Sequence, residues 1–259
     1  MKRYIENFRK FSPLLKELVT RDVKIKYRKS ILGVFWTLLN PLLMMLVLSI
    51  VFSNLFRFGV KNYPVYILSG QVIFNFFSES TSSAMTSILN NAQLIKKIYI
   101  PKYLFTLARI ASSVINIMAS CSALLLVMIL MGMELHYTMF LGIIPIICLI
   151  ILSTGMGLIL ATVTVKFRDI MHLYSVFLTA LTYLMPVIYP MSLLEETWVY
   201  KLVSINPLTV ILTMFRDLVM YGTIPMLTSF VVAIGVSVGV LVIGLIVFYK
   251  NQDKFILNL

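Results

Sequence analysis

Charge is scarce in this sequence. Only 12% of its 259 residues are Asp, Glu, Lys or Arg, whereas 60% are hydrophobic, and soluble domains carry about twice as much charge. Acids are the scarcer class, with 10 Asp and Glu against 22 Lys and Arg, so the formal net charge is +12. A bilayer core needs roughly 20 apolar residues per helix, and the chain offers several such runs. The composition therefore predicts a protein that crosses a membrane several times.

Cysteine is rare, and recognisable catalytic motifs are absent. Cys121 and Cys148 both lie in apolar runs without a CxxC spacing, so we expect buried thiols rather than a disulfide scaffold or a metal site. The sequence contains no GxxxxGK[ST] phosphate loop, no HExxH and no GxSxG. The chain is therefore not expected to be an enzyme or to hold a cofactor, and the energy for any transport must come from elsewhere.

The residues give little support to two other functional classes, a channel or carrier and an enzyme. A channel or proton-coupled carrier would favour several ionisable groups at mid-membrane, and only Glu79 lies clearly within a predicted span. A hydrolase or transferase would use the outer-side residues Glu134, His136, Glu195 and Glu196, whose spacing does not require them to meet. The basic residues are interleaved with apolar spans and form no separate basic domain, which argues against nucleic acid as a partner.

The first 32 residues differ from the rest in charge. Ten of the 22 Lys and Arg lie there, among apolar residues spaced three to four apart, which predicts a cytoplasmic amphipathic helix in the membrane interface. Ser12 and Pro13 resemble a helix start, so the helix is expected to run from Pro13 to about Lys29. The polar face of this helix carries the cations Arg21, Lys24 and Arg28. These cations could bind the phosphate of a substrate headgroup or, equally well, anionic membrane lipids.

The remaining chain divides into apolar spans and short polar breaks within a single transmembrane domain, 1–259. We predict a six-helix membrane domain over 33–249 and a cytoplasmic tail over 250–259, with spans at about 33–56, 64–87, 101–131, 139–165, from 171, and 224–249. Residues 90–103 predict a short cytoplasmic helix. The irregular segment 185–222 predicts short re-entrant or interfacial helices on the outer side, where protein can satisfy their backbone.

The distribution of positive charge orients this arrangement. With both termini in the cytoplasm, 18 of the 22 basic residues lie on the cytoplasmic side, and four lie outside: Arg57, Lys61, Lys201 and Arg216. Cytoplasmic loops of membrane proteins carry such an excess of Lys and Arg. We therefore expect a multi-pass protein with both ends inside.

Three stretches together carry a resemblance to a known family. They are RDVKIKYRKSILGVFWTLLNPLL over 21–43, NNAQLIKKIYIPKYLFTLA over 90–108, and the segment 167–222 with FRDI, LTYLMPVIYP and INPLTVILTMFRDLVMYG. The chain resembles the membrane subunit of polysaccharide-exporting ABC transporters, the group that exports O-antigen, teichoic acid and capsule precursors. An exporter of a small molecule or a lipo-oligosaccharide with the same subunit plan is the alternative.

The resemblance implies the partners. It implies a homodimer in the bacterial cytoplasmic (inner) membrane, bound to two copies of a separate ATPase subunit that holds ATP and Mg. It also implies a lipid-linked glycan as substrate. The segment received by the ATPase, a coupling helix, would be formed by Asn90, Gln93, Leu94, Ile95, Lys96, Lys97 and Pro101.

Aromatic residues gather in the first, second and fifth predicted spans. Aromatic rings offer a sugar a flat apolar face, and Tyr and Trp add a polar edge, although such residues also face lipid or form interfacial belts. As residues of a translocation path we predict Phe35, Trp36, Phe74, Phe77, Glu79, Tyr183 and Tyr189.

Overall fold

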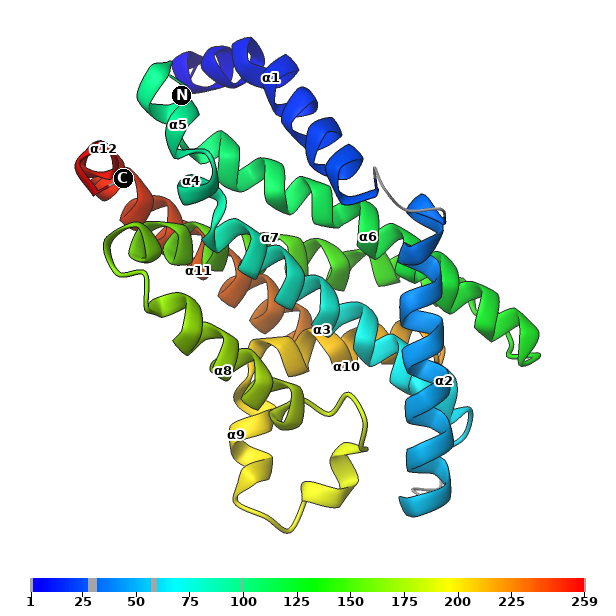
Figure 1. Ribbon diagram of the computed structural model, residues 1–259. Helices are drawn as coiled ribbons and strands as arrows, with labels where there is room; N and C mark the ends of the chain where they lie inside the picture. Colours follow the sequence, from blue (N-terminus) through cyan, green and yellow to red (C-terminus); the bar gives the residue numbers. More distant parts are fainter. Residues whose placement is uncertain (1, 28–31, 57–59, 99, 259) are drawn as a thin grey trace.

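The computed structural model describes residues 2–27, 32–56, 60–98 and 100–258. Within these ranges the chain is helical and contains no strand (Figure 1). The longer helices are α1 (Lys2–Tyr27), α2 (Trp36–Phe56), α3 (Tyr63–Met85), α6 (Tyr103–Leu130), α7 (Ile143–Lys166), α8 (Ile170–Leu184), α10 (Pro207–Val219) and α11 (Leu227–Asn251). The shorter ones are α4 (Ser87–Asn90), α5 (Ala92–Lys97), α9 (Val199–Ile205) and α12 (Phe255–Asn258), with 3-10 turns at Gly33–Phe35, Tyr137–Gly142, Met191–Leu194 and Gln252–Lys254.

Helices long and apolar enough to cross a bilayer are present. Three segments meet this description by length and composition, Tyr103–Leu130, Tyr137–Lys166 and Leu227–Lys254, and α9 with α10 forms a fourth if the pair, bent by 77°, is counted as one broken span. α2 and α8 are apolar but shorter over their described residues. α3 has 23 residues, but Asn, Gln, Glu and several Ser interrupt its apolar character. The prediction of an all-helical membrane protein is confirmed, and the count of six spans stays a prediction.

The start of the amphipathic helix differs from the expectation. α1 begins at Lys2 and continues through Pro13 to Tyr27, whereas the sequence placed the start at Pro13. A proline inside a helix removes one hydrogen bond and crowds the preceding turn, at a cost of about 3 kcal/mol. Apolar residues continue at helical spacing on both sides of Pro13, which favours one uninterrupted amphipathic helix over a new start.

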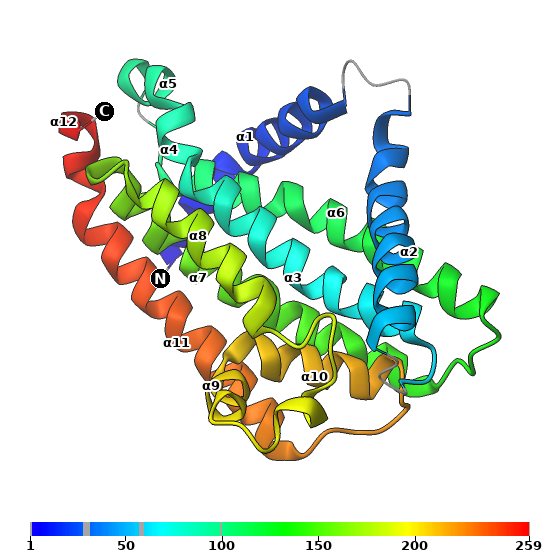
Figure 2. The same ribbon diagram turned by 60° about the horizontal axis from the view of Figure 1, so that its bottom comes forward.

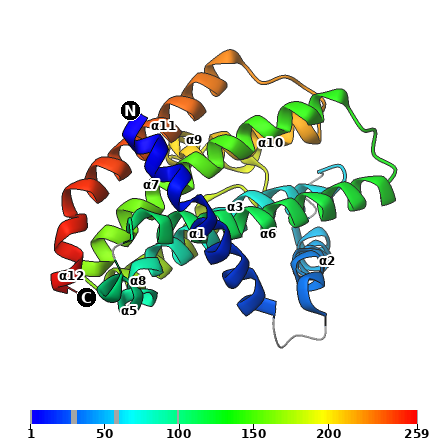
Figure 3. The same cartoon turned by 90° about the horizontal axis from the view of Figure 1, so that it is seen from above.

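Two hydrophobic clusters hold the bundle together. The larger one joins α3, α6, α7 and α10 and includes Phe76, Met128, Leu149 and Phe215, all at most 3% exposed. The smaller one joins α1, α4, α5, α6, α7, α11 and α12 at the opposite end of the bundle, toward which both described chain ends lie (Figure 1). Seen from above, α1 lies across the bundle against α6 (Figure 3).

α7 and α11 approach each other closely because two glycines face each other. A Cβ atom at Gly155 would lie 2.6 Å from the backbone of Leu241, and a Cβ at Gly244 would collide with the backbone of Gly155. Small residues permit this backbone contact between membrane helices. By contrast, a Cβ at Gly235, nearer the start of α11, would meet no atom within 4 Å.

Candidate functional site

A polar groove lies between α2, α3 and α6. It consists of two cavities of about 340 and 490 Å³ that share Asn40, Pro41, Asn75 and Glu79 as walls. The smaller cavity also touches Lys26 of α1, and the remaining lining is Trp36, Thr37, Met44, Gln71, Ser78, Ser82, Asn116 and Ser120. We call these two cavities the polar groove. α2 contacts both α3 and α6 and forms one wall (Figure 2).

The stripe of polar residues along α3 forms the floor of the groove. Gln71, Asn75, Ser78 and Ser82 follow the three- and four-residue steps that place side chains on one helix face, and Glu79 lies beside them. The stripe extends about 16 Å along the helix axis at 1.5 Å per residue. Gln71 is 6% exposed, and its Oε1 atom has no hydrogen-bond partner in the described part of the chain. Polar side chains therefore cover a large part of the length that α3 contributes to the bundle.

An ion pair stands at one side of the groove. Lys26 Nζ donates to Glu79 Oε1 at 2.6 Å, and Asn116 Nδ2 donates to the same oxygen at 2.7 Å. The side chains of Lys26 and Glu79 are 46% and 39% exposed. The pair connects α1 with the polar face of α3 in a position that solvent can reach.

α1 makes a second set of polar contacts one turn earlier. Asp22 is 8% exposed and pairs with Arg21 at 3.1 Å and with Arg109 of α6 at 3.3 Å. Arg21 also donates to Asn91 Oδ1, at 3.2 Å, at the junction of α4 and α5. The two acceptors engage the guanidinium of Arg21, whereas Lys24 is exposed and Arg28 lies outside the described residues.

The predicted coupling segment begins at the last residue of α4 and contains α5, and its side chains point both into the bundle and away from it. Asn90, Gln93, Lys96 and Lys97 are exposed, while Leu94 and Pro101 are half-buried. Ile95 is 6% exposed and belongs to the cluster that contains Leu18 of α1. The outward face of α5 is thus polar and basic, and its inward face packs into the smaller hydrophobic cluster.

The predicted path residues do not all meet. Trp36 and Glu79 line the polar groove, and Phe35 precedes Trp36 and is 53% exposed. Phe77 is 2% exposed in the larger core, against which Phe74 also packs. Tyr183 is 70% exposed at the end of α8, where its carbonyl accepts the hydroxyl of Tyr189 at 2.8 Å.

A buried arginine holds together α3, α10 and the segment that follows α8. Arg216 of α10 is 4% exposed, and its position on the exterior side of the membrane stays a prediction. Its guanidinium donates to the carbonyls of Pro186 (2.7 Å), Val187 (3.2 Å) and Tyr66 (3.0 Å) and to Ser69 Oγ (3.1 Å). It also lies 3.5 Å from the centre of the Tyr66 ring.

Two tyrosines of α3 complete this arrangement. The hydroxyl of Tyr63 donates to the carbonyl of Ile188 at 2.7 Å, and that of Tyr66 donates to the carbonyl of Tyr189 at 2.9 Å. The non-helical segment 186–189 therefore has an acceptor bond at each of its four carbonyls. We call Arg216, these tyrosines and the segment the Arg216 cluster. Such satisfaction is what irregular backbone at membrane depth requires.

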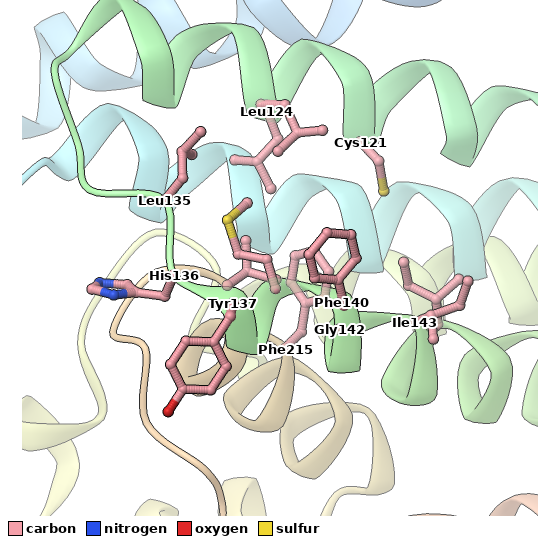
Figure 4. Close-up of a pocket in the computed structure, with 13 residues that line it drawn as sticks. Cys121, Leu124, Leu135, His136, Tyr137, Phe140, Gly142, Ile143 and Phe215 are labelled. Carbon is pink, nitrogen blue, oxygen red and sulfur yellow. The ribbon is translucent and has the colours of Figure 1, made fainter.

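A third cavity, of about 680 Å³, is apolar and lies near the loop before α7 (Figure 4). Leu124, Phe140, Ile143 and Phe215 line it, together with His136, whose ring packs against Gly222. Gly222 has φ +67°, and a Cβ there would lie 2.6 Å from the imidazole. Across the described ranges, no group of three or more His, Cys, Asp or Glu side chains is placed to hold a metal.

Several residues that line the groove were not predicted as functional residues from the sequence. Asn40, Asn75 and Asn116 are single amides in apolar runs, and the stripe along α3 could have been recognised from its spacing. Lys26 carried no signal that separated it from the neighbouring basic residues. The contact of Lys26 with Glu79 spans 53 positions and depends on how α1 crosses the bundle.

Apolar helices around a polar groove define a multi-pass membrane protein of the transporter class. The family model for the ABC-2 type transporter matches residues 13–220, and the chain belongs to this family. This family supplies the membrane component of ABC transporters and implies an ATPase on a separate chain, which would hold ATP and Mg.

Named relatives match over most of the chain. An "O-antigen export system permease protein RfbA" of Myxococcus xanthus is 28% identical over 260 residues, covering 98% of both chains. A protein of the same name from Klebsiella pneumoniae is 27% identical over 246 residues, covering 93% of both. The "Polysialic acid transport protein KpsM" of Escherichia coli is 26% identical over 211 residues, covering 80% of this chain and 81% of the relative.

Proposed function

We propose that this chain is the membrane subunit of an ATP-driven exporter that moves a lipid-linked polysaccharide from the cytoplasmic to the outer leaflet. The family and the names of the relatives, O-antigen export and polysialic acid transport, support this function. The observation that carries it within the chain is the polar groove. Amide, hydroxyl and carboxylate groups beside one indole are the groups that hydrogen-bond and stack with sugars.

The groove also supports a homodimer. Asn40 and Asn75 are both exposed in the single chain. Polar side chains directed into lipid are costly, so such residues normally face the interior of a bundle or a water-filled cavity. A second copy facing the groove would enclose it, and the glycan path would then run between α2, α3 and α6 of the two copies. Of the predicted path residues, Trp36 and Glu79 are the ones that this proposal retains in the groove.

The proposed topology has six spans, formed by α2, α3, α6, α7, α8 and α11, with α9 and α10 re-entrant from the outer side. The smaller hydrophobic cluster gathers α1, α4, α5 and α12 at one end of the bundle. The basic residues Lys96, Lys97, Lys166, Arg168 and Lys250 belong to segments at that end. This distribution fits a cytoplasmic position for that end and for both termini.

The outward face of α5 is the proposed contact for the ATPase. Each of two ATPase copies would receive one α5 helix, and Lys96 and Lys97 would meet its surface. Leu94 and Ile95 contribute differently, because Ile95 is buried in the smaller hydrophobic cluster and its replacement would disturb this chain itself. The inward face of α5 would then transmit ATPase movement to α1.

The test is co-purification of the ATPase with a charge-reversed coupling helix. In Lys96→Asp/Lys97→Asp, two carboxylates would enter the contact without partners, at a cost of several kcal/mol. We expect the variant to insert normally but to lose most of the bound ATPase and its glycan export. The matched control is Lys61→Asp/Lys201→Asp, two exposed lysines at the other end.

Three outcomes would contradict the proposal in different ways. Full ATPase binding by the α5 variant would remove the coupling assignment. An equal loss of bound ATPase in the control variant would show that the added negative charge, and not its place on α5, causes the effect. Export by the purified chain without ATPase or ATP would exclude the ABC mechanism.

A further inference from the structure

The ion pair between Lys26 and Glu79 has features that a purely structural contact does not need. It joins the last turn of α1 to the polar stripe of α3, and both side chains remain more than one-third exposed. Exposed ion pairs contribute little to stability. The contact is therefore weak enough to be exchanged for another one.

We infer that Lys26 binds the phosphate or diphosphate group of the exported lipid and that Glu79 is the counter-ion which this group displaces. The inference rests on the proposed function and assigns the headgroup site within it. A phosphate group offers several acceptor oxygens and up to two negative charges, where Glu79 offers one. Ammonium–phosphate hydrogen bonds are charge-assisted and stronger than neutral ones.

Glu79 keeps a hydrogen-bond donor when Lys26 leaves. Its Oε1 atom accepts from Asn116 Nδ2 at 2.7 Å, so the carboxylate keeps a donor on the same oxygen after the ammonium turns away. Removing one partner from an ion pair is most costly when the other is left uncompensated. The amide of Asn116 lowers that cost and so favours the exchange.

Arg21 is less suited to this role. Its guanidinium already pairs with Asp22, which is 5% exposed at the side chain, and donates to Asn91. A phosphate that recruited Arg21 would leave Asp22 with Arg109 as its remaining partner and would detach α1 from the α4–α5 junction. Among the described cations of α1, Lys26 is the one that lines the groove.

The surroundings of Lys26 favour a sugar next to the phosphate. The same 340 Å³ cavity contains Trp36, Thr37, Asn40 and Asn75. Trp36 is 44% exposed and can offer an indole face to a pyranose ring, while the amides can bind its hydroxyls. A phospholipid headgroup would use the charge of Lys26 and little of this lining. The ligand class is therefore a sugar linked through phosphate or diphosphate to a lipid.

The binding experiment uses Trp36 as its reporter. The chain contains two tryptophans, and Trp198 is 79% exposed on the outer segment, so Trp198→Phe leaves Trp36 as the only tryptophan. The full chain is placed in nanodiscs of zwitterionic lipid and titrated with farnesyl diphosphate-N-acetylglucosamine. The variants are Lys26→Gln, Glu79→Gln and Lys24→Gln, with Lys16→Gln as the matched exposed control on α1.

The two members of the pair should change affinity in opposite directions. We expect Lys26→Gln to weaken binding about tenfold, as the loss of one charged hydrogen bond implies. Glu79→Gln should tighten binding, because it removes the competing anion while keeping an acceptor for Asn116. Equal weakening by both substitutions would make the pair structural and overturn the inference. Unchanged binding in Lys26→Gln, or a larger loss in Lys24→Gln than in Lys26→Gln, would also overturn it.

Competition distinguishes the possible sources of the phosphate. Inorganic pyrophosphate should compete with the probe in the wild type and not in Lys26→Gln, whereas phosphatidylglycerol in the nanodisc should leave the affinity unchanged. Displacement by phosphatidylglycerol would identify a general anionic-lipid site and reject the substrate assignment. If Lys26→Gln with its ATPase exports glycan at the wild-type rate and KM, only this inference fails. If the wild-type complex exports no glycan, the proposed function fails.

Discussion

Arg216 and Lys26 are both cations beside polar partners, but their surroundings differ greatly. Arg216 is 4% exposed, donates to three carbonyls and a hydroxyl, and lies against the ring of Tyr66. Lys26 has a side chain that is 46% exposed and pairs with the half-exposed Glu79. The first arrangement fixes the backbone of the segment 186–189, because removing Arg216 leaves buried groups unpaired. The second can separate into water at little cost, which suits a position where a ligand is exchanged.

The largest effect is expected at Arg216. In Arg216→Met the carbonyl of Val187 loses its partner, which costs about 1–3 kcal/mol, and the desolvated contact with Tyr66 contributes about 2 kcal/mol more. We expect a marked fall in the thermal unfolding temperature in nanodiscs and a loss of folded protein. Arg216→Lys, which keeps the charge but not the planar fork of donors, should be intermediate. Wild-type stability in Arg216→Met would show that the Arg216 cluster is not a fixed scaffold.

A smaller effect is expected where α7 and α11 touch. Gly155→Ala places a methyl group 2.6 Å from the backbone of Leu241, which cannot rotate away as a side chain could. Overpacking of this kind costs about 1–3 kcal/mol. Thermal unfolding should show this loss, while Gly235→Ala on α11, with no atom within 4 Å, should be neutral or slightly stabilising. Equal effects of the two substitutions would contradict the close crossing.

The smallest effect on stability is expected at Glu79. Glu79→Gln removes an exposed ion pair but retains an oxygen for Asn116, so the stability change should stay below about 1 kcal/mol. The same variant should change substrate affinity, as measured by Trp36 fluorescence. Unfolding in increasing salt provides the control, since wild type and variant should converge as the pair is screened. A loss as large as that of Arg216→Met would remove the contrast between the two sites.

The sequence was informative where the signal was local. An apolar run predicted a span over 64–87, which matches α3, and the segment 90–103 was predicted to hold a short helix, which matches α5. The polar stripe on α3 is equally local, at spacings of three and four, and could have been predicted from Gln71 to Ser82. The inward direction of Ile95 was not predictable, because it depends on a cluster formed by residues of distant helices.

Contacts between distant segments account for most of what the sequence did not predict. Arg216 finds its acceptors 29 to 150 positions away, in Val187 and Tyr66 among others. Several cations on α1 had equivalent local patterns, and only the crossing of α1 over the bundle separates Arg21, which donates to Asn91, from Lys26, which reaches Glu79. The positions of the charges along α1 thus predicted an amphipathic helix in the membrane interface, but not which side chain each cation contacts.

The short polar stretch at the end of α1 has a mechanical consequence. Arg21 touches Asn91 beside α5, and Lys26 touches Glu79 in the groove, about 7.5 Å further along the same helix. An α-helix carries a push along its axis with little compression, because each turn is braced by hydrogen bonds to the next. A displacement of α5 that moved Asn91 would therefore also shift the last turns of α1 and, with them, the ammonium group of Lys26.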